Sequence, residues 1–109
     1  MAGKLNAQDT LGDALQMYCM AVLEKVSRTI PNSKVEPNGQ SAAKMLTPAS
    51  IGYSYIYVGF MPNGDLQVLS HGALASGRPT ALFGSIKLGR AVGLTVKALA
   101  NKIIAQLGS

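Results

Sequence analysis

The chain has 109 residues, of which 48% are hydrophobic and only 14% are charged, and its formal net charge is +5. This length is typical of one domain with one core and leaves no room for a second, so we expect a single domain over residues 1–109. The low share of charged residues favours exposed apolar surface, and therefore a homo-oligomer, most simply a dimer.

The positive charge is confined to the second half of the chain. Basic and acidic residues balance over residues 1–65, whereas residues 66–109 contain basic residues and no acid. An anionic partner is therefore expected to meet the second half.

We expect a cytoplasmic protein that binds no membrane. Residues 1–6 lead into acidic residues with no apolar segment of the kind that a targeting signal needs. The long uncharged stretch 45–64 is interrupted by Pro48 and Pro62, so it does not predict a membrane span. The single cysteine, Cys19, has no partner for an intrachain disulfide and is interpreted as a buried small hydrophobe in a reducing compartment.

A helix is predicted from Thr10 to Ile30. Thr10 can cap its N-terminus, with Asp13 three residues further on, and Pro31 ends it. Apolar residues recur at steps of three and four and so share one face: Leu11, Leu15, Tyr18, Val22, Val26 and Ile30.

Residues 31–50 are predicted to form a surface connection. Turn signals at Pro31, at Pro37-Asn38-Gly39 and at Pro48 surround a short helical turn over residues 41–46.

A β-hairpin is predicted for residues 51–61 and 66–71. The first run is rich in aromatic and β-branched residues, the second run alternates, and Pro62-Asn63-Gly64-Asp65 supplies the turn between them. Alternation along the first strand places its residues on two faces, with Tyr53, Tyr55 and Tyr57 on one and Ile56, Val58 and Phe60 on the other.

The hairpin is followed by a flexible segment, residues 72–80, and then by a long C-terminal helix. The helix is predicted from the spacing of Leu88, Val92, Val96, Leu99, Ile103 and Leu107, with Gly108 as its cap. Residues 80–86 fit the start of that helix, a third short strand or a separate turn. Ser85, Gly89 and Gly93 would give the helix a smooth face for close packing.

Together these elements predict an α+β fold. An N-terminal helix, an antiparallel hairpin with a third strand as one alternative, and a C-terminal helix would form two layers, with the helices on one face of the sheet. A dimer would complete the structure.

Catalysis, metal binding and a cofactor are not expected. The single histidine, His71, has no carboxylate spaced to pair with it, and a polar residue at a strand end is the simpler interpretation. One histidine and one cysteine cannot form a ligand cluster for a metal ion.

The candidate binding segment is residues 70–93. It combines glycines, hydroxyl groups and cations without any acid, and these groups together can bind phosphate. No known phosphate-binding motif is present, and a flexible surface loop with solvated charges is the alternative. The candidate ligand-binding residues here are Ser70, His71, Ser76, Arg78, Thr80, Ser85, Lys87 and Arg90.

The three tyrosines on one strand face are candidates for base stacking. Tyr53, Tyr55 and Tyr57 would hold nucleobases in a sequence-tolerant way. A half-buried sheet face or a dimer interface is the alternative interpretation.

In its layout the chain resembles small accessory proteins encoded by bacteriophages. The resemblance lies in the N-terminal helix, a hairpin tipped by Met61-Pro62-Asn63-Gly64-Asp65, the exit Ser70-His71-Gly72 and a closing helix rich in small residues. It implies a non-catalytic role, such as anti-defence action on a host protein or sequestration of a nucleotide signal, and it transfers no functional residue.

The leading hypothesis is a homo-oligomeric binding protein for an anionic, nucleotide-like ligand, with Arg78 and Arg90 on phosphate and one or more tyrosines on the base. The first alternative is a protein–protein inhibitor or adaptor that covers an acidic host partner. The second is sequence-independent binding of nucleic acid, which would weaken steeply with salt.

Overall fold

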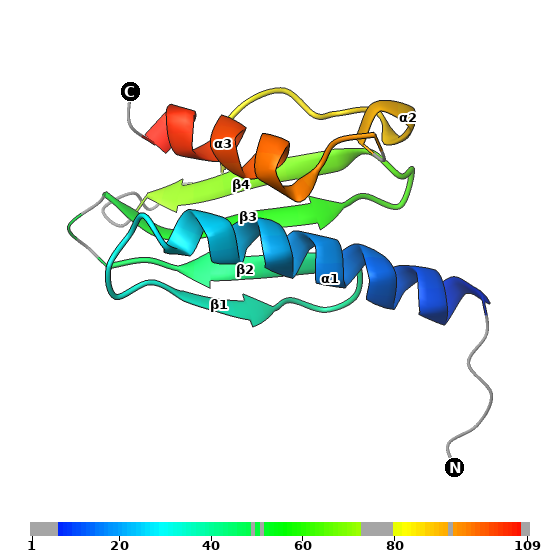
Figure 1. Cartoon of the computed structure of the whole chain (residues 1–109), viewed down its shortest axis with the longest axis horizontal. Helices are drawn as coiled ribbons and strands as arrows, with labels where there is room; N and C mark the ends of the chain where they lie inside the picture. The colour runs from blue at the N-terminus through cyan, green and yellow to red at the C-terminus, as the bar shows by residue number, and fades with distance from the viewer. Residues whose placement is uncertain (1–6, 49, 51, 73–79, 92, 108–109) are drawn as a thin grey trace, which may run out of the picture.

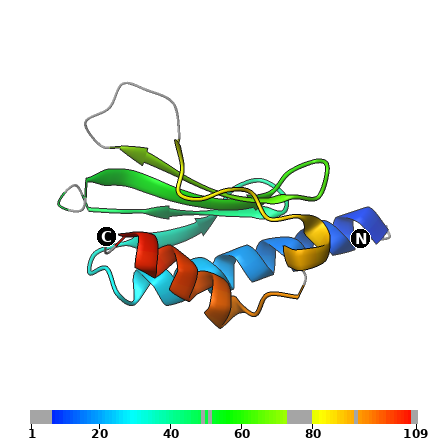
Figure 2. The same cartoon turned by 90° about the horizontal axis from the view of Figure 1, so that it is seen from above.

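Alternating apolar residues form the centre of a five-stranded antiparallel sheet with the strand order β1-β2-β3-β4-β5 (Figure 1). The computed structural model describes residues 7–48, 50, 52–72, 80–91 and 93–107. The two long helices lie on the same side of this sheet, as Figure 2 shows. The α+β fold predicted from the sequence, with helices on one sheet face, is therefore confirmed.

The predicted hairpin is present as β3 (Tyr53–Phe60) and β4 (Leu66–Gly72). Its turn is closed by a hydrogen bond from the Met61 N–H to the Asp65 carbonyl, 2.7 Å, and Gly64 has a φ of 93°, which favours glycine. Ile56 and Val58 are fully buried on the side of the helices. The opposite side of β3 carries half-buried tyrosines.

The alternation of the tyrosines is interrupted by a β-bulge near the start of β3. Tyr55 pairs with His71 and Tyr53 with Gly72, so Ser54 is an extra residue between them. Tyr55 and Tyr57 share a face, but the prediction that Tyr53 continues their row is wrong, because the inserted residue breaks the period of two.

The prediction of a surface connection with a helical turn over residues 31–50 is wrong. These residues form a second hairpin, β1 (Lys34–Pro37) and β2 (Ala42–Leu46), in which β2 pairs with β3 from Ala42 opposite Gly59 to Leu46 opposite Tyr55. The predicted turn at residues 37–39 is the tip of this hairpin, where Gly39 has a φ of 73°. Pairing with β3 and burial of Met45 outweigh the helix propensity of the β2 residues.

Both edges of the sheet are short. β5 (Thr80–Ala81) has two residues and Ile86 makes one further bridge to Leu66, so the third-strand alternative holds for only part of residues 80–86. At the other edge, β1 has four residues and ends in Pro37. Short edges of this kind disfavour pairing with strands of another chain.

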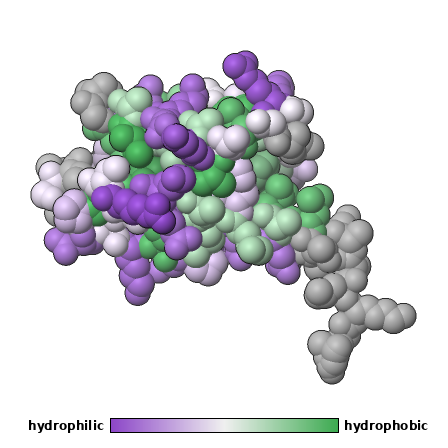
Figure 3. Space-filling view, viewed as in Figure 1, coloured by the Kyte–Doolittle hydropathy of each residue, from purple (hydrophilic) through white to green (hydrophobic). Residues whose placement is uncertain are grey.

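The first helix, α1 (Ala7–Ser27), begins and ends three residues earlier than predicted. Its residues Cys19, Val22, Leu23 and Val26 are fully buried against the sheet. The N-terminal part of α1 extends past the sheet in Figure 2, and hydrophobic surface is exposed near that end in Figure 3. Leu11 of the predicted apolar stripe is accordingly 59% exposed.

The C-terminal helix is divided, contrary to the prediction. A single turn, α2 (Leu88–Ala91), is separated from α3 (Val96–Leu107) by a turn at Gly93. The Thr95 hydroxyl accepts a hydrogen bond from the Ala98 N–H, 3.0 Å, and so caps α3 as a new helix. Ser85 lies outside both helices, so the predicted smooth helix face does not form.

One hydrophobic core lies between the sheet and the helices α1 and α3. Its largest fully buried side chains come from both layers and are Leu23, Met45, Ile56, Leu66, Leu99 and Ile103. In the part of the chain that the structure describes, no helix is both long enough and apolar enough to cross a membrane.

Candidate functional site

Three of the candidate ligand-binding residues line one pocket, which we call the basic pocket. Ser85, Lys87 and Arg90 meet there, although they belong to the stretch after β5 and to α2. The pocket has a volume of about 350 Å³, and its lining is Phe83, Gly84, Ser85, Ile86, Lys87, Arg90, Leu94 and Lys102. It combines three cations with an apolar wall, and no acidic residue is among these eight.

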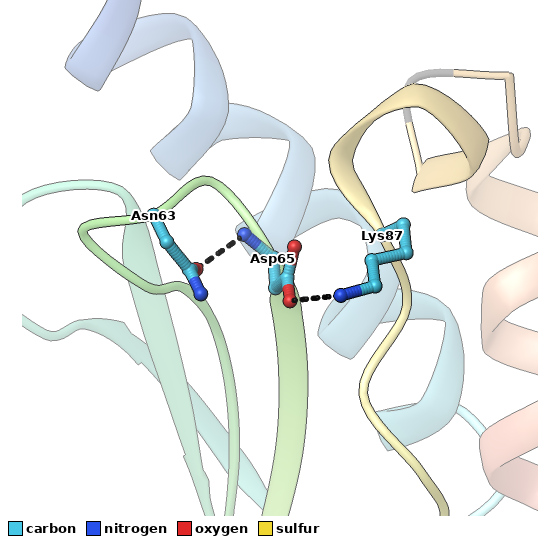
Figure 4. Close-up of polar contacts among 3 residues, drawn as sticks. All are labelled: Asn63, Asp65 and Lys87. Atoms are coloured by element: carbon cyan, nitrogen blue, oxygen red, sulfur yellow. Dashed lines mark hydrogen bonds and ion pairs between the residues drawn. The ribbon is translucent and has the colours of Figure 1, made fainter.

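One carboxylate lies beside the basic pocket and contacts a pocket cation. The Asp65 Oδ2 atom is 3.7 Å from the Lys87 Nζ atom, and the Asn63 side chain accepts a hydrogen bond from the Asp65 N–H (Figure 4). The Lys87 side chain is 86% exposed, whereas that of Asp65 is 16% exposed. The hairpin turn therefore fixes the Asp65 backbone, and its carboxylate is largely buried, whereas the lysine remains largely in water.

The other two cations of the basic pocket are held differently. The Lys102 Nζ atom lies 4.9 Å from the centre of the Phe83 ring, a cation–π contact that places its charge at the pocket wall. Arg90 is exposed and makes no ion pair with any residue of the described ranges. Its guanidinium group is thus available to an anion.

Gly84 and Gly89 of the segment do not serve the protein's own packing. A Cβ atom added at Gly84 or Gly89 would meet nothing within 4 Å. The missing side chains leave space at and near the pocket rather than allowing a close contact within the chain. The helix α2 is a single turn, so it contributes no substantial helix dipole to the pocket.

The remaining candidates of the segment lie elsewhere. Ser70 is buried, and its hydroxyl donates to the Thr80 carbonyl, 3.3 Å, so it links β4 to β5. Thr80 is exposed at this sheet edge. Ser76 and Arg78 lie outside the described residues, so their predicted roles remain predictions.

A second pocket lies on the sheet face opposite the helices, and we call it the tyrosine pocket. It has a volume of about 420 Å³. Strand residues Lys44, Tyr55, Tyr57, Gln67 and Leu69 line it together with Asn38 and Met61 from the strand ends. Tyr53 is not part of this lining.

The Tyr57 ring lies over the backbone at Gly59. A Cβ atom added at Gly59 would stand 2.2 Å from the Tyr57 Oη atom and 2.5 Å from its Cζ atom. Only glycine at this position leaves room for the ring. Burial raises the pKa of Tyr57 above its ordinary value of 10.0, with a smaller contribution from Cys19, so its hydroxyl is a hydrogen-bond donor at neutral pH.

His71 is beside the tyrosine pocket rather than the basic pocket. Its ring stacks on Tyr55, with 5.4 Å between ring centres and 11° between ring planes. The Ser54 Oγ atom is 3.0 Å from both the His71 Nδ1 atom and the His71 carbonyl oxygen. The hydroxyl has a single proton and cannot donate to both, so donation to the carbonyl requires a proton on Nδ1.

The structure does not bring Arg90 together with the tyrosines. The basic pocket is built from the segment after β5, α2 and α3, whereas the tyrosine pocket is built on the other sheet face, and they have no residue in common. Arg90 and the tyrosines therefore cannot hold the phosphate and the base of one ligand in a single pocket of this chain, and the two candidate sites are separate.

Cys19 fits the interpretation of a buried small residue. Its side chain is fully buried, and the thiol donates to the Ser41 carbonyl at 3.6 Å. Burial raises its pKa from 9.0 to about 12. Among the described residues, no group of three histidine, cysteine, aspartate or glutamate side chains lies close enough together to hold a metal ion.

Comparison with known proteins gives no assignment: no family model, no curated protein and no solved structure matches this chain. The resemblance to bacteriophage accessory proteins stays a prediction.

Proposed function

We propose that this protein is a non-catalytic binding protein whose basic pocket holds the phosphate group of a nucleotide-like ligand. One observation carries the proposal: the cations Lys87, Arg90 and Lys102 line a single pocket that has no acidic residue in its lining. Like charges are not brought together on a protein surface without cost, so their convergence favours an anionic ligand.

The chemistry of the lining suits a phosphate. Arg90 can donate two parallel hydrogen bonds to phosphate oxygens, while the lysines act as point charges and Ser85 supplies a hydroxyl donor. Phe83 provides an apolar wall for the remainder of the ligand. A volume of about 350 Å³ is within the range that small-molecule sites occupy.

Asp65 is expected to compete with the ligand for Lys87. An ion pair with one largely exposed partner contributes little to stability, so a phosphate with two negative charges can draw Lys87 away from Asp65. The carboxylate then sets the affinity, because it remains close to the bound anion and repels it.

Isothermal titration calorimetry tests the proposal with pyrophosphate, ribose 5-phosphate and a panel of nucleotides that includes cyclic dinucleotides. At least one of these should bind saturably, and Arg90→Ala should weaken binding about tenfold or more. Arg28→Ala is the matched control. It removes the same charge just after the end of α1, which lies at the opposite end of the molecule from α2 (Figure 1).

Asp65→Asn provides the opposite test, because it removes the competing charge and should strengthen binding severalfold. The absence of binding across the panel contradicts the proposal. Equal losses in Arg90→Ala and Arg28→Ala contradict it too, since they indicate general attraction of anions to a basic protein, as in sequence-independent binding of nucleic acid.

A further inference from the structure

The Tyr57 ring is held as a flat platform on the open face of the sheet. Its phenol end covers Gly59, where a Cβ atom would stand 2.2–2.8 Å from three ring and hydroxyl atoms. The phenol end of the ring is thus held against the Gly59 backbone, and the side chain lines the tyrosine pocket. Aromatic rings exposed in this way on a sheet stack with planar heteroaromatic rings.

The polar groups around this platform are those that recognise the edge of such a ring. Asn38 and Gln67 line the same pocket, and neither side-chain amide has a hydrogen-bond partner within the part of the chain that the structure describes. Each amide offers two donors and an acceptor, which match the alternating donors and acceptors of a nucleobase. The Tyr57 hydroxyl adds a further donor.

Charge on the open face favours a small ring over a long polyanion. Lys44 lies 3.9 Å from Glu36 and 5.6 Å from the centre of the Tyr55 ring, so its charge is partly neutralised. Lys34 is the other lysine of the paired strands on this face. Two lysines and one glutamate provide few phosphate contacts, whereas a nucleic acid strand is bound mainly through such contacts.

From these observations we infer that the tyrosine pocket is a second binding site, in which a nucleobase-like ring stacks on Tyr57 and is read at its edge by Asn38 and Gln67. The pocket volume of about 420 Å³ suits one nucleoside. This site has no residue in common with the basic pocket and does not depend on the phosphate site proposed above.

Nuclear magnetic resonance titration with adenosine, guanosine, cytidine and uridine tests this inference, because none of them carries a phosphate. At least one nucleoside should shift the signals of Tyr57, Asn38 and Gln67 saturably while leaving those of α2 unchanged. Tyr57→Ala should weaken binding about fivefold to a hundredfold, whereas Tyr57→Phe keeps the ring, loses one donor and should weaken binding much less. Tyr53→Ala is the matched control, because it truncates a tyrosine of the same strand outside the pocket lining.

The inference is overturned if no nucleoside shifts these signals at millimolar concentration. This test uses the parent protein, so it does not depend on whether Tyr57→Ala folds. It is also overturned if native mass spectrometry shows a dimer and the same signals depend on protein concentration, because a second copy then covers the face. Nucleoside binding, together with a phosphate panel in which Arg90→Ala weakens no ligand more than Arg28→Ala does, contradicts only the proposed function. Binding of a phosphate ligand that depends on Arg90, without binding of any nucleoside, contradicts only the inference.

Discussion

The two faces of the sheet are made by the same strands but have opposite environments. On the covered face, Ile56, Val58 and Val68 are at most 1% exposed beneath α1 and α3. On the open face, the neighbouring residues Tyr55, Tyr57 and Leu69 are only half-buried and line a pocket.

This difference separates stability from function along each strand. Side chains on the covered face exclude water and are close-packed, so a lost methyl group there leaves a cavity. Side chains on the open face retain polar atoms without partners among the described residues, as Asn38 and Gln67 do. Substitutions one residue apart should therefore have different consequences.

The largest effect is expected for Ile56→Ala. Ile56 is fully buried at the centre of β3, and truncation should lower the free energy of unfolding by about 2–5 kcal/mol. Leu69→Ala is the matched truncation on the open face of β4 and should cost about 1 kcal/mol, because its side chain is already partly in water. Urea unfolding measures both, and equal losses would contradict the assignment of the two faces.

An intermediate effect is expected for Gly59→Ala, which tests whether the open face has packing of its own. The new methyl group would displace the Tyr57 ring, at a cost of about 1–3 kcal/mol in the free energy of unfolding. In a Tyr57→Ala background the collision is gone, and alanine should then stabilise the strand by about 0.5–1 kcal/mol relative to glycine. The same penalty in both backgrounds would show that the ring does not lie over Gly59.

The contrast between the two hairpins explains how much of the fold the sequence could predict. β3 and β4 were predictable because a run rich in aromatic and β-branched residues and a run of alternating apolar and polar residues flank Pro62-Asn63-Gly64-Asp65. The residues of β2, Ala42–Leu46, are of types that favour helices, and only pairing with β1 and β3 makes them a strand. The bulge at Ser54 likewise has no local signal, since it depends on the register of two strands.

The candidate sites follow the same rule. Ser85, Lys87 and Arg90 were predictable because they are close in a segment without acids. Lys102 of the basic pocket was missed because it comes from α3, outside the candidate binding segment. In the tyrosine pocket, Asn38, Lys44 and Gln67 were missed because tertiary pairing alone brings them beside the tyrosines. The signal for Gln67 would have been its position in the alternating run, where a polar amide stands on the exposed side of the predicted strand.

The last effect is expected at alkaline pH and involves both faces. Burial raises the pKa of Cys19 on the covered face to about 12, above its ordinary value of 9.0, and burial also raises the pKa values of Tyr57 and Tyr18. Below pH 9 these groups are neutral in both the folded and the unfolded chain. As the pH rises further, the unfolded chain loses its protons first, so the stability is lost between pH 9 and about 12.

The Cys19 share of this loss is measurable by difference. Urea unfolding at about pH 8 and about pH 10.5, under reducing conditions, should show a decline of at most about 1.4 kcal/mol per pH unit from this thiol. Cys19→Ala should have a shallower decline of the free energy of unfolding with pH. Tyr57→Phe should reduce this decline by less than Cys19→Ala does, because the Tyr57 ring is only half-buried. Identical slopes in the parent protein and Cys19→Ala would mean that the thiol ionises as easily in the folded chain as in the unfolded one. That result would contradict the burial of the thiol between α1 and the sheet, because burial disfavours the charged thiolate.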